Sequence, residues 1–171
     1  MTGVDTETLR LTQAPLKEKY RADPDSGKVT LHASGSLGDG VSCTVDTGRA
    51  LAEAGLHPAT GGDGSQLCSG DMLLQALAAC AGVTLRAVAL ALGIDIRQGT
   101  VQVDGDLDFR GTLAVDRDAP VGFADIRVSF RLATDASPEQ LATLHRLTER
   151  YCVVYQTLTR PPALSQELHA D

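Results

Sequence analysis

The longest hydrophobic stretch of the chain lies near its middle, from Met72 to Leu92. Only Gln75, Thr84 and Arg86 interrupt it as clearly polar residues. Leucine and alanine dominate the stretch and favour a helix. Apolar residues fall on nearly every face of that helix, which is typical of a buried position. The pattern therefore predicts a long central helix that other elements surround.

Residues at both ends of this stretch support the same helix. Ser69 is a suitable N-cap, and Asp71 places negative charge in the first turn. Gly93 is a natural residue for the position after the last turn. The stretch also has about the 20 apolar residues that a membrane span needs. Arg86, past its middle, would be costly in lipid, so we interpret the helix as the centre of a globular protein.

Two later segments alternate between apolar and polar residues. They are Ile96–Phe109 and Val121–Leu132, and residues 116–120 lie in the connection between them. A period of two predicts half-buried antiparallel strands. The apolar faces comprise Val101, Val103, Gly105, Leu107 and Phe109 in the first strand, and Ile126, Val128, Phe130 and Leu132 in the second.

The N-terminal part of the chain predicts a hairpin. Residues 28–37 and 41–45 form its strands, and Gly-Asp-Gly at positions 38–40 forms its turn. Residues 49–54 are interpreted as a short helical turn. The first 27 residues are an N-terminal extension, and the domain itself covers residues 28–171.

A second helix is predicted close to the C-terminus. Ser137 is its N-cap, Pro138 occupies the first helical position, and Gln140 completes a capping box. Cys152 follows at the end of this helix, and residues 153–158 start another short helix. The apolar stripe of the longer helix comprises Leu141, Leu144, Leu147 and Tyr151.

The order of these elements predicts an α+β fold. A strand pair, a buried helix, a second strand pair and a helix follow one another, which favours an antiparallel sheet covered by helices. The central helix is too apolar for the surface of a small monomer, so we expect a homodimer.

Composition narrows the classes of partner. The chain has 171 residues, of which 43% are apolar and 22% charged, and its formal net charge is −7. This charge argues against non-specific binding to nucleic acid or to an anionic membrane, since both need basic patches. It leaves a small-molecule ligand open.

Four cysteines occupy positions 43, 68, 80 and 152, without a CxxC pair. The four histidines form neither HxxxH nor HExxH, so a structural zinc site is not expected. The N-terminal residues lack the pattern of a signal peptide, and we expect a cytoplasmic protein in a reducing compartment. A thiol there is either a small core residue or chemically useful.

Two segments resemble a known family. Residues 69–80, SGDMLLQALAAC, form a loop that opens a buried helix leading to a cysteine. Residues 149–158, ERYCVVYQTL, place a second cysteine after a helix and before a short helical stretch. Together they resemble the OsmC/Ohr superfamily. The resemblance covers about residues 28–160, including the strand pair between the two cysteines.

The resemblance implies an intertwined homodimer in which Cys80 is the peroxidatic cysteine and Cys152 the resolving one. It implies reduction of organic hydroperoxides, and less efficiently of hydrogen peroxide, without a metal or organic cofactor. In such chemistry a thiolate attacks the O–O bond and becomes a sulfenic acid, and a second thiol condenses with it. An external thiol reductant then reduces the disulfide by exchange.

The ionised thiol needs a positive neighbour. The family uses an arginine from an early loop and a carboxylate from the start of the buried helix. Arg49 and Arg21 are the candidates for the arginine, and Arg86 is the third. Asp71 is the candidate carboxylate, although it serves equally well as a first-turn helix charge. For Arg86, a structural ion pair is the competing interpretation.

The chain departs from the family pattern at two positions. Many peroxidase members carry a glutamate where this chain has Gly70 or Asp71, and the proline that commonly follows the second cysteine is Val153. These departures bear on the rate of peroxide reduction more than on the fold.

Other roles stay open for the cysteines. Cys80 is otherwise an inert thiol in an alanine-rich helix, and Cys152 a core residue. Cys68 is either an alternative resolving thiol or a bystander, and Cys43 packs on a strand. His57 is a turn residue or part of a pocket wall. The alternative functions are a non-catalytic small-molecule-binding protein and a redox-sensing stress protein on the same fold.

Overall fold

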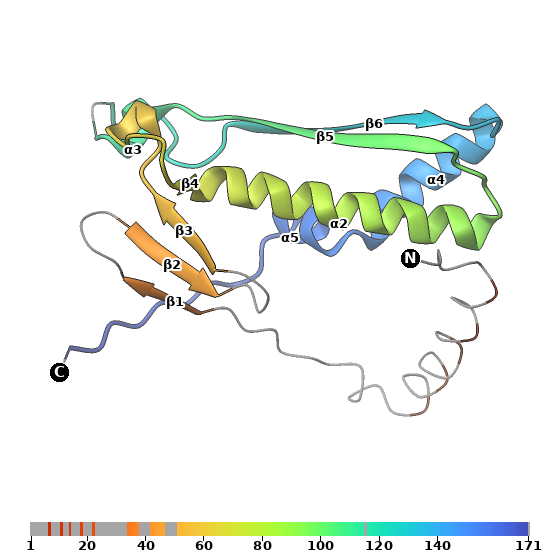
Figure 1. Ribbon diagram of the computed structural model, residues 1–171, viewed down its shortest axis with the longest axis horizontal. Coiled ribbons are helices and arrows are strands. Elements are labelled where there is room, and N and C mark those ends of the chain that lie inside the picture. The colour runs from red at the N-terminus through yellow and green to blue at the C-terminus, as the bar shows by residue number, and fades with distance from the viewer. Residues whose placement is uncertain are drawn as a thin grey trace. The chain divides into compact units, whose positions relative to one another are not determined.

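The fold is described from a computed structural model, which covers residues 34–37, 42–46, 51–114 and 116–170 and the separate positions Glu7, Leu11, Ala14, Glu18 and Ala22. Figure 1 shows its elements in chain order: β1 (Ser34–Leu37), β2 (Ser42–Asp46), β3 (Leu51–Gly55), η2 (Pro58–Thr60), β4 (Leu67–Cys68), α2 (Ser69–Leu92), β5 (Gln98–Asp106), α3 (Phe109–Thr112), β6 (Asp125–Ala133), α4 (Pro138–Tyr151) and α5 (Val153–Thr159).

The chain divides into two compact units. The first comprises residues 1–74 and 104–127, and the second comprises residues 75–103 and 128–171. Each unit is described separately. The predicted α+β class is confirmed, since helices and strands alternate along the chain as expected.

The first unit contains a four-stranded sheet in the order β1-β2-β3-β4. The predicted hairpin is confirmed, because β1 and β2 pair in antiparallel register from Ser34 opposite Asp46 to Leu37 opposite Cys43. Residues 28–33 and the turn at 38–40 lie outside the described residues, as does most of the N-terminal extension.

The predicted helical turn at residues 49–54 is wrong. Residues 51–55 form β3, which pairs with β2 in antiparallel register. On its other side β3 pairs with β4 in parallel, so this sheet is not wholly antiparallel. Alanine and glutamate favour a helix locally, but backbone pairing on both sides outweighs that weak preference.

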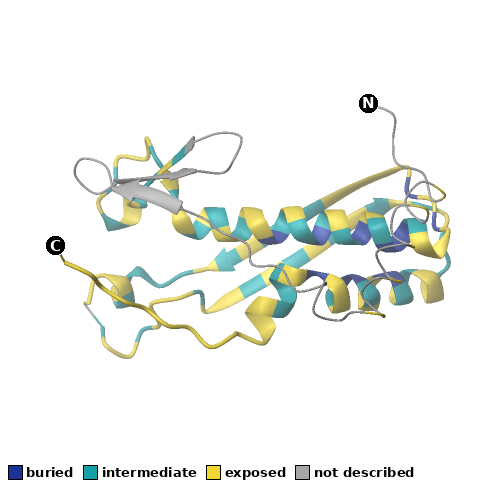
Figure 2. Cartoon of the chain, turned by 90° about the horizontal axis from the view of Figure 1, so that it is seen from below, coloured by how far each residue is buried: buried dark blue, intermediate teal, exposed yellow. Residues whose placement is uncertain are grey.

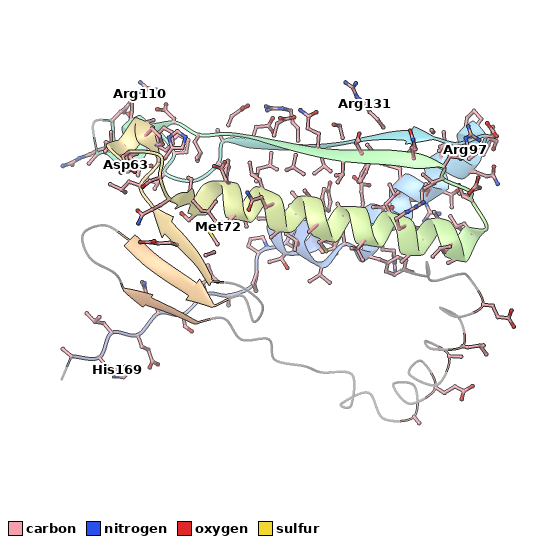
Figure 3. All side chains as sticks on the ribbon, viewed as in Figure 1. Asp63, Met72, Arg97, Arg110, Arg131 and His169 are labelled. Carbon is pink, nitrogen blue, oxygen red and sulfur yellow. The ribbon has the colours of Figure 1, made fainter. Side chains whose placement is uncertain are left out.

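The strands β5 and β6 form a two-stranded antiparallel sheet. The Arg97 N–H donates to the Ala133 carbonyl at 2.9 Å, and the Ala124 N–H donates to the Asp106 carbonyl at 2.8 Å. Exposed and half-buried residues alternate along all of β6 and along β5 from Thr100 onward, as predicted, whereas Gln98 and Gly99 at the start of β5 are both exposed. Figure 3 shows Arg131 pointing away from α2, as expected for a residue between the half-buried Phe130 and Leu132.

The first of these strands is shorter than predicted. β5 ends at Asp106, and Phe109 opens the short helix α3 instead of extending the strand. The Asp108 carboxylate accepts a hydrogen bond from the Arg110 backbone N–H at 3.0 Å and caps this helix. An aspartate in this position favours a helix start over a continued strand.

The core of the second unit lies between α2, α4 and the β5–β6 pair. Its buried residues are Leu85, Val88, Ala89, Ile94, Ile96 and Leu144, and Phe130 and Leu132 pack against them. In Figure 2 the buried residues of α2 and α4 lie on facing sides of the two helices. The predicted central helix packed against a sheet is therefore confirmed.

The prediction that α2 is buried on nearly every face is wrong for the single chain. Its buried residues follow one stripe, Leu77, Ala81, Leu85, Val88 and Ala89. On other faces Val83 is 72% exposed and Leu73 38% exposed. One chain supplies too few elements to surround this helix. By length and composition α2 also resembles a membrane span, a test that core helices of globular proteins pass as well.

Gly93 ends α2 as predicted. Its φ of +68° lies in the left-handed region, its N–H donates to the Leu90 carbonyl, and the Ile94 N–H donates to the Ala89 carbonyl. These two hydrogen bonds form a Schellman motif, which glycine accommodates without a steric penalty. The motif turns the chain so that Ile94 and Ile96 enter the core.

This geometry predicts that Gly93→Ala lowers the free energy of unfolding by about 1 kcal/mol, because a Cβ is disfavoured at positive φ. Urea unfolding measures the change. Gly122→Ala is the matched control: neither glycine has a heavy atom within 4 Å of an added Cβ, but only Gly93 has a positive φ. Equal effects of both substitutions would contradict the backbone explanation.

The predicted N-terminus of α4 is confirmed. The Ser137 hydroxyl accepts from the Gln140 N–H, the Gln140 side chain accepts from the Ser137 N–H, and Pro138 occupies the first turn. The predicted stripe ends differently, because Tyr151 is 58% exposed and Thr148 is buried. The Thr148 hydroxyl donates to the Leu144 carbonyl at 2.8 Å, so the buried oxygen is satisfied.

Candidate functional site

Cys152 sits at the junction of two helices, as predicted. It is the C-cap of α4 and the N-cap of α5, with extended backbone angles (φ −74°, ψ 108°). It lies four positions after the buried Thr148, so it continues the buried face of α4, and only 1% of it is exposed. The break in the helix leaves the first N–H groups of α5 without helical acceptors.

Cys80 lies on α2, between the buried Leu77 and Ala81, and is itself half-buried. Its side chain forms a hydrogen bond with that of Cys152, and both thiols are free. Two cysteines that are 72 positions apart in the sequence are thus neighbours in the second unit.

The environment of Cys80 favours its ionised form. Burial opposes ionisation, but hydrogen bonds from the Val154 N–H, the Cys152 thiol, the Thr84 hydroxyl and the Val153 N–H outweigh it, and the pKa of Cys80 lies below its ordinary value. Donors directed at a sulfur stabilise the thiolate over the thiol. The Cys80 thiolate is therefore more populated near neutral pH than that of an ordinary cysteine.

The pKa of Cys152 shifts in the opposite direction. Burial raises its pKa, the hydrogen bond and the negative charge of Cys80 raise it further, and N–H groups of Tyr155 and Val154 offset only part of this. When one proton leaves the pair, it therefore leaves Cys80. The arrangement favours a thiolate at Cys80 beside a protonated thiol at Cys152.

Sequence reasoning missed three of the groups that act on Cys80. Thr84 lies one helical turn after Cys80 on α2, a spacing that places both side chains on one face. The N–H groups of Val153 and Val154 belong to the first turn of α5. The i, i+4 spacing was a usable indication for Thr84, whereas the backbone donors depend on how the helices pack.

The hydroxyl of Thr84 is open to a direct test. Thr84→Val removes one donor to the sulfur, so we expect the pKa of Cys80 to rise and its alkylation by iodoacetamide to shift to higher pH. Mass spectrometry of Cys80 across a pH series measures the midpoint. Thr84→Ser keeps the hydroxyl and should keep the midpoint close to that of the parent chain. A midpoint that Thr84→Val leaves unchanged would contradict the assigned hydrogen bond.

The other predicted polar groups have different positions. Asp71 is exposed in the first turn of α2, where its charge favours the helix N-terminus. Arg21 and Arg49 lie outside the described residues. The Arg86 guanidinium donates to the Ile96 carbonyl at 2.8 Å, and among the described residues Arg86 forms no ion pair. A backbone carbonyl just beyond the end of α2 thus accepts from this exposed cation.

Cys43 and Cys68 belong to the first unit. Cys43 lies on β2, opposite Ala54 of β3. Cys68 ends β4 and is half-buried, and its sulfur lies 3.6 Å from the position that a Cβ on Gly70 would occupy. Phe123 approaches the same position to 3.4 Å, so an apolar side chain lies close to Cys68.

His57 serves the turn that contains it. Its Nδ1 accepts a hydrogen bond from the Ala59 N–H at 3.0 Å and caps η2. The imidazole also stacks on Phe109, with ring centroids 4.9 Å apart. Within the described parts of the chain, no group of three His, Cys, Asp or Glu side chains is placed to hold a metal ion.

Comparison with known proteins identifies the fold and the family. The model of the family described as OsmC-like protein matches residues 62–167. No protein with a curated function matches the sequence. An OsmC like protein from Mycoplasma pneumoniae has a similar structure, with a TM-score of 0.66 and 18% identity over 78% of this chain and 90% of that one.

Two further structures carry functional names. An organic hydroperoxide resistance protein OsmC from Legionella pneumophila has a TM-score of 0.57 and 15% identity, over 77% of this chain and 90% of that one. An organic hydroperoxide resistance protein from Elizabethkingia anophelis has a TM-score of 0.57 and 17% identity, over 78% and 90%. At these identities the likeness concerns the fold. The family match covers more than half of the sequence, and the chain therefore belongs to the OsmC-like protein family.

Proposed function

We propose that this chain is a thiol-dependent peroxidase that reduces organic hydroperoxides through Cys80 and Cys152. The contact between the two thiols, with the pKa of Cys80 lowered and that of Cys152 raised, is the observation that carries the proposal. The names of the proteins from Legionella pneumophila and Elizabethkingia anophelis support the choice of organic hydroperoxides over other oxidants.

The reaction begins at the Cys80 thiolate. Its sulfur attacks the O–O bond and takes one oxygen to become a sulfenic acid, while the other oxygen leaves as an alkoxide and gains a proton to form an alcohol. Hydrogen bonds from the Thr84 hydroxyl and the N–H groups of Val153 and Val154 lower the free energy of the attacking thiolate. They are neutral donors, and Arg21, Arg49 and Asp71 stay the proposed charged contributors.

Cys152 then completes the oxidation. Its sulfur bonds to the sulfenic sulfur of Cys80, and the hydroxyl leaves as water, which produces a disulfide. The raised pKa keeps Cys152 protonated beside the Cys80 thiolate, and the loss of that thiolate on oxidation removes the repulsion that opposes its ionisation. An external thiol reductant restores both cysteines by exchange. The dependence on such thiols favours a reducing compartment, the cytoplasm.

A homodimer is part of the proposal. The exposed apolar residues of α2 include Leu73, Val83 and Leu92. A soluble monomer rarely leaves so many apolar side chains of one helix in water. A second copy of the chain offers an equally apolar helix to cover them. Light scattering after size-exclusion chromatography measures the mass, and a monomer at micromolar concentration would contradict this part.

Steady-state turnover tests the proposed reaction. Catalytic amounts of the reduced protein should consume cumene hydroperoxide over many cycles when dithiothreitol supplies the electrons, and cumyl alcohol should appear in equal amount. Hydrogen peroxide should react more slowly. Consumption no faster than that without protein would contradict the proposal and would favour a non-catalytic role for the same fold.

A further inference from the structure

A cavity of about 720 Å³ lies on the surface of the second unit, between the end of α4 and α5. Its volume falls in the range of small-molecule pockets. Its walls consist almost entirely of polar and charged side chains: Arg146, Glu149, Arg150, Tyr151, Tyr155, Gln156, Thr159 and Arg160.

The wall carries a net positive charge because three arginines outnumber its single carboxylate, Glu149. The Glu149 carboxylate accepts a hydrogen bond from the Tyr155 hydroxyl at 3.1 Å and lies 4.0 Å from His145, whereas Gln156 donates to the Glu149 carbonyl at 2.8 Å. Among the described residues, none of the arginines in the wall pairs with a carboxylate. Arg150 lies over the ring of Tyr151, 5.8 Å from its centroid, which leaves its charge in place.

The positions of the arginines indicate a ligand. Arg146 and Arg150 stand one turn apart on α4, an arrangement of like charges that lowers helix stability. Arg160, at the C-cap of α5, adds a third positive charge to the same cavity. A favourable role for this concentration of charge, in a chain whose formal net charge is −7, is the binding of an anion.

We propose that the cavity between α4 and α5 binds a small molecule through a phosphate group. Three guanidiniums match a phosphate dianion in charge once Glu149 is counted, and each offers paired N–H donors that fit phosphate oxygens. The Gln156 amide, which donates one N–H to the Glu149 carbonyl, has a second N–H that adds a neutral donor to the wall. A monocarboxylate would satisfy fewer of these groups.

One residue, Tyr155, links the cavity to the thiol pair. The side chain of Tyr155 lines the cavity, while its backbone N–H forms a hydrogen bond with the Cys152 sulfur. A ligand held there contacts the same short helix that supplies donors to both sulfurs. The binding itself does not depend on peroxide chemistry, so it is testable whether or not the proposed peroxidase activity exists.

Isothermal titration of the reduced full chain tests the site, with inorganic phosphate and pyrophosphate as probes at constant ionic strength in sodium chloride. We expect saturable binding of both, tighter for pyrophosphate. The double variant R146Q/R150Q should weaken pyrophosphate binding by about tenfold or more, the effect of losing charge-assisted hydrogen bonds. Arg117→Gln removes an equally exposed arginine outside the cavity and should leave the affinity unchanged.

The outcomes separate the proposal from its rivals. Absence of saturable binding, or equal loss in R146Q/R150Q and Arg117→Gln, would overturn it, since either result indicates general charge attraction. Tighter binding of citrate than of pyrophosphate would also overturn it in favour of a carboxylate site. A change of oligomeric mass in R146Q/R150Q, measured by light scattering, would show that the arginines face a second copy of the chain.

Discussion

Replacing Cys80 by serine should reduce the turnover of cumene hydroperoxide by about three orders of magnitude or more, the scale seen when an enzyme loses its nucleophile. The serine hydroxyl stays protonated near neutral pH, and no base stands beside it among the groups that act on Cys80. Initial rates with dithiothreitol as reductant measure the loss.

The matched control is Cys68→Ser. Cys68 is also half-buried and free, but it lies in the first unit beside Gly70 and Phe123. Its replacement should leave the rate within about twofold, the range of substitutions away from a reacting group. A comparable loss in both variants would contradict the assignment of Cys80 as the attacking thiol.

Replacing Leu144 by alanine should lower the free energy of unfolding by about 3 kcal/mol. Leu144 is 2% exposed and belongs to the core cluster with Leu85, Val88 and Ile96, so the deleted carbons leave a cavity between α4 and α2. Urea unfolding measures the change. The protein concentration is held fixed so that dissociation of a dimer contributes equally to both variants.

Leu164→Ala is the matched control, because it makes the same substitution at an exposed leucine. Leu164 is 90% exposed after the end of α5, and its truncation should change the free energy of unfolding by less than about 0.5 kcal/mol. An effect of Leu144→Ala as small as that of Leu164→Ala would show that the described core does not stabilise the second unit.

Local sequence patterns predicted the elements whose determinants are local. The capping box at Ser137, the left-handed Gly93 and the alternation along β5 and β6 all depend on residues within a few positions. β3 was missed because its alanines and glutamate favour a helix, and its strand conformation depends on pairing with β2 and β4. Such pairing is not visible in a short window of sequence.

In the thiol site, too, some features depend on local sequence and others on how the helices pack. The resemblance to a known family singled out Cys80 and Cys152, and the helix break at Cys152 could be predicted from the chain. The end of the buried stripe of α4 could not, because Tyr151 and Cys152 are adjacent and only packing decides which of them enters the core. The donors to the Cys80 sulfur follow from that packing and became visible only in three dimensions.

The exposed faces of α2 could not be predicted from its sequence either. The composition of Met72–Leu92 predicts burial on nearly all sides, whereas the single chain buries one stripe. The remaining apolar side chains indicate how much surface is left for a second copy. We attribute the difference to the homodimer proposed above, in which a second copy would cover these side chains.

The central claim is that Cys80 and Cys152 form a redox pair, and disulfide mapping tests it most directly. The reduced chain is treated with one equivalent of cumene hydroperoxide, alkylated, digested and examined by mass spectrometry. We expect each chain to lose two thiols and two hydrogens, and a peptide pair joined by a Cys80–Cys152 disulfide, with Cys43 and Cys68 still alkylated. Cys80 and Cys152 both recovered as alkylated thiols, or Cys80 joined to Cys68 instead, would contradict the claim.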